Sequence, residues 1–96
     1  SITKSARTSV VIECTIEGRS MADQYVHWYR RKEDSKNLEW ILYYQTPSNY
    51  KNGQDFQNGF SAIKTKDANN CILVLRYPSE KDSGTYFCAD STDTLH

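Results

Sequence analysis

The chain has 96 residues, enough for one small domain with a thin hydrophobic core. Its 12 basic and 12 acidic residues balance to a formal net charge of +0 and are scattered along the sequence, so neither a basic block for nucleic acid nor an acidic disordered tail is present. The length predicts a single domain, residues 1–96. No apolar run approaches the roughly 20 residues that cross a bilayer, so we expect no direct membrane contact by this domain.

Short apolar alternation at a period of two, broken by polar turns, recurs along the chain and predicts β-strands. Taken in order, the predicted strands are residues 10–16, 25–30, 38–44, 60–65, 71–76 and 85–89. The predicted turns and loops between them are residues 32–37, 46–59, 67–70 and 80–84. Because no helical pattern lies between the strands, the sequence predicts an all-β fold, an antiparallel sandwich.

Four residues carry a family resemblance. Cys14, Trp28 and Cys88 stand in the order and spacing of the immunoglobulin core, and Tyr86 lies two residues before Cys88. Residues 82–88 are similar to the end of a variable domain. The chain therefore resembles the variable-type immunoglobulin family, a β-sandwich of two antiparallel sheets with Greek-key topology. The resemblance implies a Cys14–Cys88 disulfide between the sheets, Trp28 packed on it, and a Tyr86 hydroxyl bonded to backbone.

The middle of the chain makes the resemblance more specific. Residues 27–30 and 38–40 are similar to the partner-facing strands of variable domains. Residues 42–44 and 69–76 look most like a T-cell receptor gamma chain, while an immunoglobulin heavy chain or another T-cell receptor chain is an alternative. The resemblance implies binding of a protein or MHC-like antigen, pairing with a second, delta-like variable domain, and an extracellular place in a cell-surface receptor.

Both ends depart from the family pattern. Fewer residues precede Cys14 than in the family, and no Phe-Gly-x-Gly joining motif follows Cys88, so shortened first and last strands are expected. Two interpretations stay open. Either the sequence is part of a longer domain, or it is a surrogate-light-chain-like piece whose final strand comes from another chain.

A partner-facing patch is implied by the resemblance at Tyr29, Leu38, Trp40 and Phe87. These side chains are large and apolar or aromatic, and an exposed patch of that kind invites association. The predicted role is an interface with a second variable domain; the alternative is cover by a long third loop of the same chain. Arg31 stands where the family usually has glutamine, and we expect it to meet a carboxylate, carbonyl or water in the partner.

A charged cluster beneath the sandwich is implied at Arg30, Glu39 and Asp82. A planar guanidinium can serve two carboxylates at once. The family usually adds a second basic residue just before Phe60, where this sequence has Gly59, which leaves Arg30 as the main expected partner of Asp82. We interpret these carboxylates as structural and not as catalytic acids.

Three recognition loops are implied by the resemblance at residues 18–25, 45–51 and 90 onward. Tyrosines in such loops offer large contact area at low entropic cost, although the same rings could instead hold the loops together. The expected antigen-binding side chains are Arg19, Asp23, Tyr25, Tyr44, Tyr50, Asp90 and Asp93.

Other chemistry has no pattern in the sequence. Cys71 alternates with Leu73 and Leu75, which favours a buried free thiol over an intermolecular disulfide. The sequence has no Cys-x-x-Cys motif, so a zinc site is not predicted. His27 and His96 occur without the serine-containing nucleophile elbow of a hydrolytic triad. The sequence therefore predicts a binding module without catalytic residues, cofactor or metal. The rival class is an adhesive or structural immunoglobulin domain of the cell surface.

Overall fold

A computed structural model describes residues 9–15, 24–66 and 70–90 of the chain. Within these residues the backbone forms strands and two short 3-10 helices. In chain order they are β1 (Ser9–Thr15), β2 (Val26–Arg31), β3 (Glu39–Thr46), β4 (Asn49–Asn52), η1 (Gln54–Phe56), β5 (Phe60–Lys64), β6 (Asn70–Arg76), η2 (Glu80–Asp82) and β7 (Thr85–Asp90). The predicted all-β class is confirmed.

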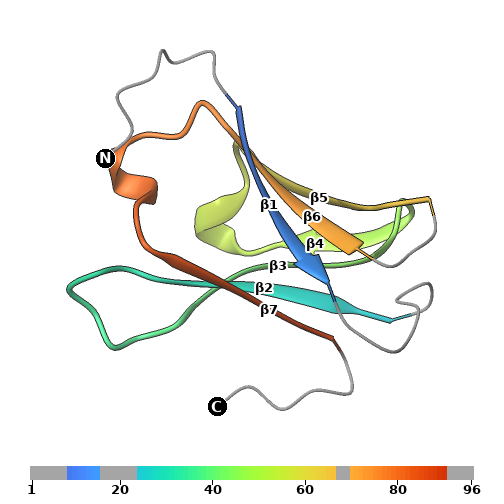
Figure 1. Cartoon of the computed structure of the whole chain (residues 1–96), viewed down its shortest axis with the longest axis horizontal. Coiled ribbons are helices and arrows are strands. Elements are labelled where there is room, and N and C mark those ends of the chain that lie inside the picture. Colours follow the sequence, from blue (N-terminus) through green and yellow to red (C-terminus); the bar gives the residue numbers. More distant parts are fainter. Residues whose placement is uncertain (1–8, 16–23, 67–69, 91–96) are drawn as a thin grey trace.

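The strands form two antiparallel sheets that face each other. One sheet has the order β1-β6-β5 and the other β4-β3-β2-β7. In Figure 1 the first sheet forms the upper layer and β2, β3 and β7 lie in the lower one. The chain crosses between layers after β1, β4 and β6, so neighbouring strands such as β1 and β6 are distant in sequence. This is the Greek-key sandwich that the resemblance implied.

The predicted loop at residues 46–59 is wrong in part, because it contains β4 and η1. Two of the four residues of β4 are asparagines, which are depleted in strands, and this composition hid the strand in the sequence. The strand is held in register by its neighbour and by Gly53, whose N–H donates to the Ile41 carbonyl at 2.7 Å. A Cβ on Gly53 would lie 2.9 Å from the Trp40 carbonyl oxygen, so this close approach needs glycine.

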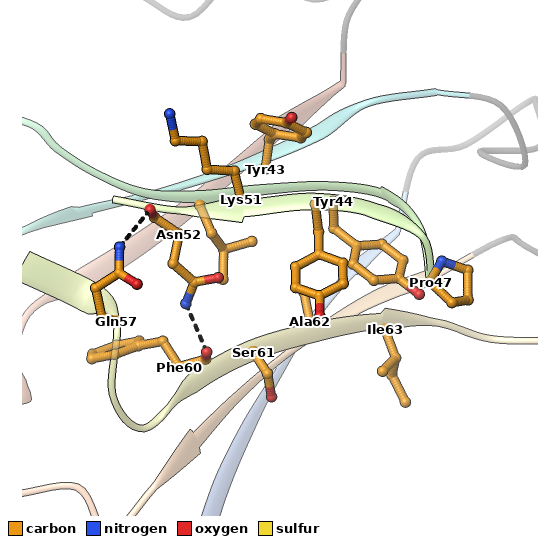
Figure 2. Close-up of a pocket in the computed structure, with 12 residues that line it drawn as sticks. Tyr43, Tyr44, Pro47, Lys51, Asn52, Gln57, Phe60, Ser61, Ala62 and Ile63 are labelled. Atoms are coloured by element: carbon orange, nitrogen blue, oxygen red, sulfur yellow. Dashed lines mark hydrogen bonds between the residues drawn. The ribbon is translucent and has the colours of Figure 1, made fainter. Parts of the chain in front are cut away.

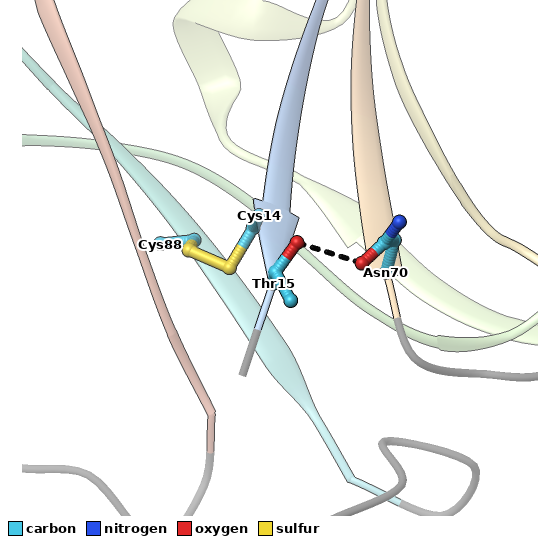
Figure 3. Close-up of a disulfide and its surroundings, with 4 residues drawn as sticks. All are labelled: Cys14, Thr15, Asn70 and Cys88. Carbon is cyan, nitrogen blue, oxygen red and sulfur yellow. Dashed lines mark hydrogen bonds between the residues drawn. A yellow bond between two sulfur atoms is a disulfide. The ribbon is translucent and has the colours of Figure 1, made fainter. Parts of the chain in front are cut away.

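The predicted disulfide is confirmed. Cys14 in β1 and Cys88 in β7 are bonded across the two layers, with their Cα atoms 6.2 Å apart (Figure 3). Trp28 is buried in the same cluster as Cys14. Cys71 is free and buried, as predicted, and pairs directly with Cys14 in the β1–β6 register. Closing a loop of 74 residues restricts the unfolded chain and stabilises the fold by roughly 4 kcal/mol.

A tight connection joins η2 to β7. Ser79 and Asp82 cap η2 together. The Ser79 side chain accepts backbone N–H groups of the first turn, and the Asp82 side chain accepts the Ser79 backbone N–H. Gly84 follows with φ 153°, and a Cβ there would lie 2.7 Å from the Arg31 carbonyl oxygen. The Tyr86 hydroxyl then donates to the Asp82 carbonyl at 2.5 Å, the backbone bond that the resemblance implied. The glycine thus lets β7 begin against the end of β2.

Candidate functional site

The outer face of the four-stranded sheet carries the predicted partner patch. Along β2 the burial alternates, so Trp28 and Arg30 point to the core and Tyr29 points outward. Tyr29 lies opposite Trp40 of β3 on one side and Phe87 of β7 on the other. The structure therefore brings these three predicted residues side by side. Leu38 lies two residues before Trp40, just ahead of β3, so alternation places it on the same side, and it is 41% exposed.

A β-bulge changes which residues of β3 face outward. Trp28 pairs with Leu42 and Tyr29 pairs with Trp40, so Ile41 is an extra residue in the ladder. Ile41 and Leu42 are consequently both buried, and the alternation after them is reversed. Simple alternation from Trp40 would put residue 43 inward and residue 44 outward.

The bulge corrects one predicted recognition residue. Tyr44 belongs to the buried core and is only 7% exposed, so it is not available as an antigen-binding anchor. Burial raises the pKa of its hydroxyl. Tyr43, which sequence reasoning did not select, faces outward instead. The signal that could have found it is the pair of adjacent apolar residues, Ile41 and Leu42, inside an otherwise alternating strand.

Tyr43 is at the centre of a cluster of aromatic rings on this face. Its ring centroid lies 5.4 Å from that of Tyr25, 5.9 Å from His27 and 6.4 Å from Trp40. His27 also stacks on Tyr29 at 6.3 Å. Such offset and tilted contacts are favourable for aromatic pairs. We call this set the outer aromatic face and define it by Tyr25, His27, Tyr29, Trp40, Tyr43 and Phe87.

The His27 imidazole within the outer aromatic face is poorly solvated. Burial lowers the pKa of His27. Its Nδ1 atom is buried and has no hydrogen-bond partner in the part of the chain that the structure describes. An imidazole in such surroundings favours its neutral form, so the face around it is apolar in character.

Arg31 lies at one end of this face. Its guanidinium carbon is 5.4 Å from the ring centroid of Phe87, which is the geometry of a cation–π contact. Within the described ranges no carboxylate forms an ion pair with Arg31. The acidic residues of the adjacent turn, Glu33 and Asp34, line a separate hollow together with Glu80 and Lys81. That Arg31 meets a carboxylate, carbonyl or water of a partner stays a prediction, and the described residues place no carboxylate on it.

The predicted cluster around Arg30 is present beneath the sheet. The Nε atom of Arg30 donates to Glu39 at 3.2 Å and its Nη1 atom to Asp82 at 3.3 Å. Burial lowers the pKa of Arg30, but the proximity of Tyr86 and Glu39 outweighs it, and the net shift is upward. The guanidinium also lies 4.9 Å from the ring centroid of Phe56. This arrangement holds a charge within the fold.

Phe56 is a contact that sequence reasoning missed, since it falls in the predicted loop 46–59. Its ring is buried in η1 and meets Phe60 edge-on at 5.0 Å. The signal was a single large apolar residue among polar neighbours, which in a turn indicates an anchor into the core.

The bases of the first two predicted recognition loops are joined by the amide of Asn49. Its Nδ2 atom donates to the Tyr25 hydroxyl at 3.0 Å and to Gln45 Oε1 at 2.7 Å. The Tyr43 hydroxyl donates to Asn49 Oδ1 at 3.3 Å. Tyr25, a predicted recognition residue, is thus fixed to β4 and to the outer aromatic face. Sequence reasoning did not select Asn49, whose contact with Tyr25 joins residues 24 positions apart in the chain.

Lys64 joins the same region to the other sheet. From β5, its Nζ atom donates to the backbone carbonyls of Gln24 at 2.7 Å and Gln45 at 2.8 Å. Gln24 lies just before β2 and Gln45 near the end of β3, so both carbonyls flank predicted recognition loops. The lysine thereby fixes the distance between the two loop bases.

The other predicted recognition residues divide into two groups. Tyr50 is exposed on β4 with its ring stacked on Tyr44 at 6.1 Å. Asp90 is the last residue of β7, where its backbone lies opposite Val26. The remaining predicted residues, Arg19, Asp23 and Asp93, lie outside the described residues.

A hollow of about 780 Å³ separates the edges of β4 and β5. In Figure 2, Tyr43 and Lys51 point away from it, and Asn52 points toward β5. The Asn52 side chain donates to the Phe60 carbonyl at 2.8 Å, and the Gln57 side chain donates to the Asn52 carbonyl at 3.2 Å. Tyr44 and Tyr50 are among the lining residues, so these two predicted recognition side chains lie at the flank of the sandwich.

Metal and membrane features were searched in the same residues. In residues 9–15, 24–66 and 70–90, no group of three or more His, Cys, Asp or Glu side chains is arranged to hold a metal ion. Over those ranges, no helix has the length and apolarity needed to cross a bilayer.

Comparison with known proteins gives a consistent set of relatives. The model of the immunoglobulin V-set domain matches residues 1–96. T cell receptor gamma variable 5 of Homo sapiens is 36% identical over 94 residues, covering 93% of this chain and 74% of that protein. Pre-B lymphocyte protein 3 of Homo sapiens is 26% identical over 80 residues, covering 81% of this chain. The Ig heavy chain V region MOPC 315 of Mus musculus is 24% identical over 88 residues, covering 92% of this chain. This chain spans 64% of the length of each of the latter two.

Proposed function

The chain belongs to the immunoglobulin V-set family, and on that premise we propose that it is the antigen-recognition variable domain of a T-cell receptor gamma-like chain. In this proposal the domain works outside the cell as part of a surface receptor. It binds a protein or MHC-like antigen non-covalently through loops 18–25, 45–51 and 90 onward. It pairs side by side with a second variable domain, for which a delta-like chain is the expected class.

The outer aromatic face is the observation that carries the pairing proposal. Tyr29, Trp40 and Phe87 are adjacent in the register, and Leu38 is exposed beside them. A domain that worked alone would be expected to carry polar side chains there, because exposed apolar patches promote association. Burial of such a patch contributes roughly 25 cal/mol per Å² before the costs of association.

The recognition proposal is supported by how the loop bases are held. Asn49 and Lys64 link residues that flank the first two loops to both sheets. Loops that start from fixed bases lose less entropy when they bind, which favours recognition. Tyr25 and Tyr50 stay as proposed anchors, with Arg19, Asp23, Asp90 and Asp93 as proposed polar contacts.

The pairing proposal can be tested with Leu38→Arg. The chain and a T-cell receptor delta variable domain are mixed, and the mass of the complex is measured by light scattering. We expect the native chain to form a heterodimer and Leu38→Arg to abolish it, because a guanidinium would be buried among apolar side chains. Circular dichroism should be unchanged, since Leu38 does not face the core.

Val11→Arg is the matched control. Val11 is an exposed apolar residue of β1 in the other sheet, so its replacement should leave pairing intact. A heterodimer that survives Leu38→Arg would show that another face is used. No heterodimer with any variable domain would favour the adhesive class over the receptor class.

A further inference from the structure

Arg31 is a charged residue within a surface that is otherwise aromatic. Its side chain leaves β2 on the same side as Tyr29 and lies over Phe87. Any partner that covers Tyr29 and Phe87 also removes water from the Arg31 guanidinium. The cation–π contact offsets only a part of that loss. The charge therefore needs a counter-ion when the face is covered.

The chain itself does not offer that counter-ion in the part that the structure describes. Glu39 points beneath the sheet to Arg30 at 3.2 Å, and Asp82 binds the same guanidinium at 3.3 Å. Glu33 and Asp34 face the hollow beside η2. Since none of residues 9–15, 24–66 and 70–90 places a carboxylate on Arg31, we look for the counter-ion in the domain that covers the face.

We propose that Arg31 selects the partner of this face: it favours a domain that presents a carboxylate opposite the guanidinium and it opposes pairing of two copies of this chain. This inference rests on the proposed pairing function. A planar guanidinium over an aromatic ring leaves its N–H edge free for a bidentate carboxylate. The proposal therefore specifies the partner by its chemistry, an acidic side chain set among apolar ones.

The cost for two identical copies follows from symmetry. A two-fold interface buries the same patch of both subunits, so two Arg31 side chains would be desolvated together. Each would lack a carboxylate, and the two like charges would repel within a screening length of about 10 Å. A copy in which residue 31 is acidic removes both penalties and supplies the missing group.

The experiment uses copies of this chain as the probe. Sedimentation equilibrium is measured for the native chain, for Arg31→Gln, for Arg31→Glu, and for an equimolar mixture of the native chain with Arg31→Glu. One component carries a fluorophore on its N-terminal amine so that mixed dimers are counted separately. We expect the mixed dimer to be at least about tenfold tighter than either homodimer and to weaken as NaCl is raised.

Arg31→Gln should self-associate more strongly than the native chain, because it removes the repulsion and keeps the apolar face. Arg76→Glu is the matched control: it makes the same charge change at an exposed position of β6 in the other sheet, and should not bind the native chain more tightly. The inference is overturned if the Arg31→Glu mixture is no tighter than the Arg76→Glu mixture. It is also overturned if the native chain self-associates as strongly as Arg31→Gln. Neither result changes the Leu38→Arg test with the delta domain, so the two proposals fail separately.

Discussion

Two neighbouring arginines on β2 have opposite surroundings. Arg30 points beneath the sheet, where Glu39 and Asp82 bind it and Phe56 lies against it. Arg31 points to the outer face, where Phe87 lies against it and no described carboxylate binds it. Each guanidinium therefore has an aromatic neighbour, and among the residues that the structure describes only the inner one has counter-ions.

The difference separates charge that serves folding from charge that serves association. A strand places successive side chains on opposite faces, so one step along the chain moves an arginine from the interior to a surface. Inside, an uncompensated charge would cost free energy of folding. On the surface, water solvates the charge until a partner covers it. The desolvation cost then lowers the free energy of binding and not that of folding.

Replacing each arginine in turn tests this comparison most strongly. We expect Arg30→Gln to lower the free energy of unfolding by about 2–4 kcal/mol, because it leaves two carboxylates near a buried site. Arg31→Gln should change it by less than about 0.5 kcal/mol, as exposed substitutions usually do. Urea denaturation of both variants measures the difference. Equal losses would mean that the two environments are energetically alike.

The two carboxylates of the inner cluster should differ from each other. The Asp82 side chain is 20% exposed and that of Glu39 is 39% exposed, so water screens the second ion pair more. We expect Asp82→Asn to cost about 1–2 kcal/mol and Glu39→Gln less than about 1 kcal/mol. Asparagine can still accept the Ser79 N–H through its Oδ1 atom, so the helix cap is retained. Thermal denaturation of the pair would contradict this order if Glu39→Gln were the more damaging change.

The aromatic neighbours offer a smaller test. Phe56→Leu removes a contact with Arg30 and the edge-on contact with Phe60, and we expect a loss of about 1 kcal/mol. Phe87→Leu removes only the exposed contact with Arg31 and should cost about half as much. Combining Phe56→Leu with Arg30→Gln gives a double-mutant cycle. Strict additivity would show that the inner cation–π contact contributes nothing.

The smallest expected effect is a pH dependence from His27 on the outer face. Burial lowers its pKa in the folded state, so the unfolded chain binds the proton more tightly. The associated stability is present above the unfolded pKa of about 6.5 and is lost as pH falls through the lower folded pKa. Melting temperatures between pH 8 and about 5 should therefore fall slightly more for the native chain than for His27→Gln. Parallel curves would mean that His27 is fully solvated.

Sequence patterns predicted the features that depend on local alternation or fixed spacing. The six predicted strands and the buried Cys71 follow from local alternation, whereas the Cys14–Cys88 bridge and the contacts of Arg30 were implied by the family resemblance. The β-bulge at Ile41 was not predictable in this way, because one inserted residue reverses every later facing direction. That reversal places Tyr44, a predicted recognition residue, in the core and turns Tyr43 outward.

Long-range contacts were the other missing part. The contacts of Asn49 and Lys64 join residues up to 40 positions apart, and no periodicity in the sequence encodes them. The polar residues of β4 resemble a loop until the neighbouring strand supplies the other half of the ladder.

The position of Cys71 opposite Cys14 affects how this protein should be handled. Three sulfur atoms lie in one region of the core, and burial raises the pKa of the free thiol, which keeps it protonated and poorly nucleophilic. Unfolding removes that protection, and a thiolate can then attack the neighbouring bridge and exchange its partner. Heating at alkaline pH should therefore trap mis-paired chains that do not return on cooling. We expect correctly folded protein to be recovered after a heating cycle when the buffer is acidic or when Cys71 is replaced by serine.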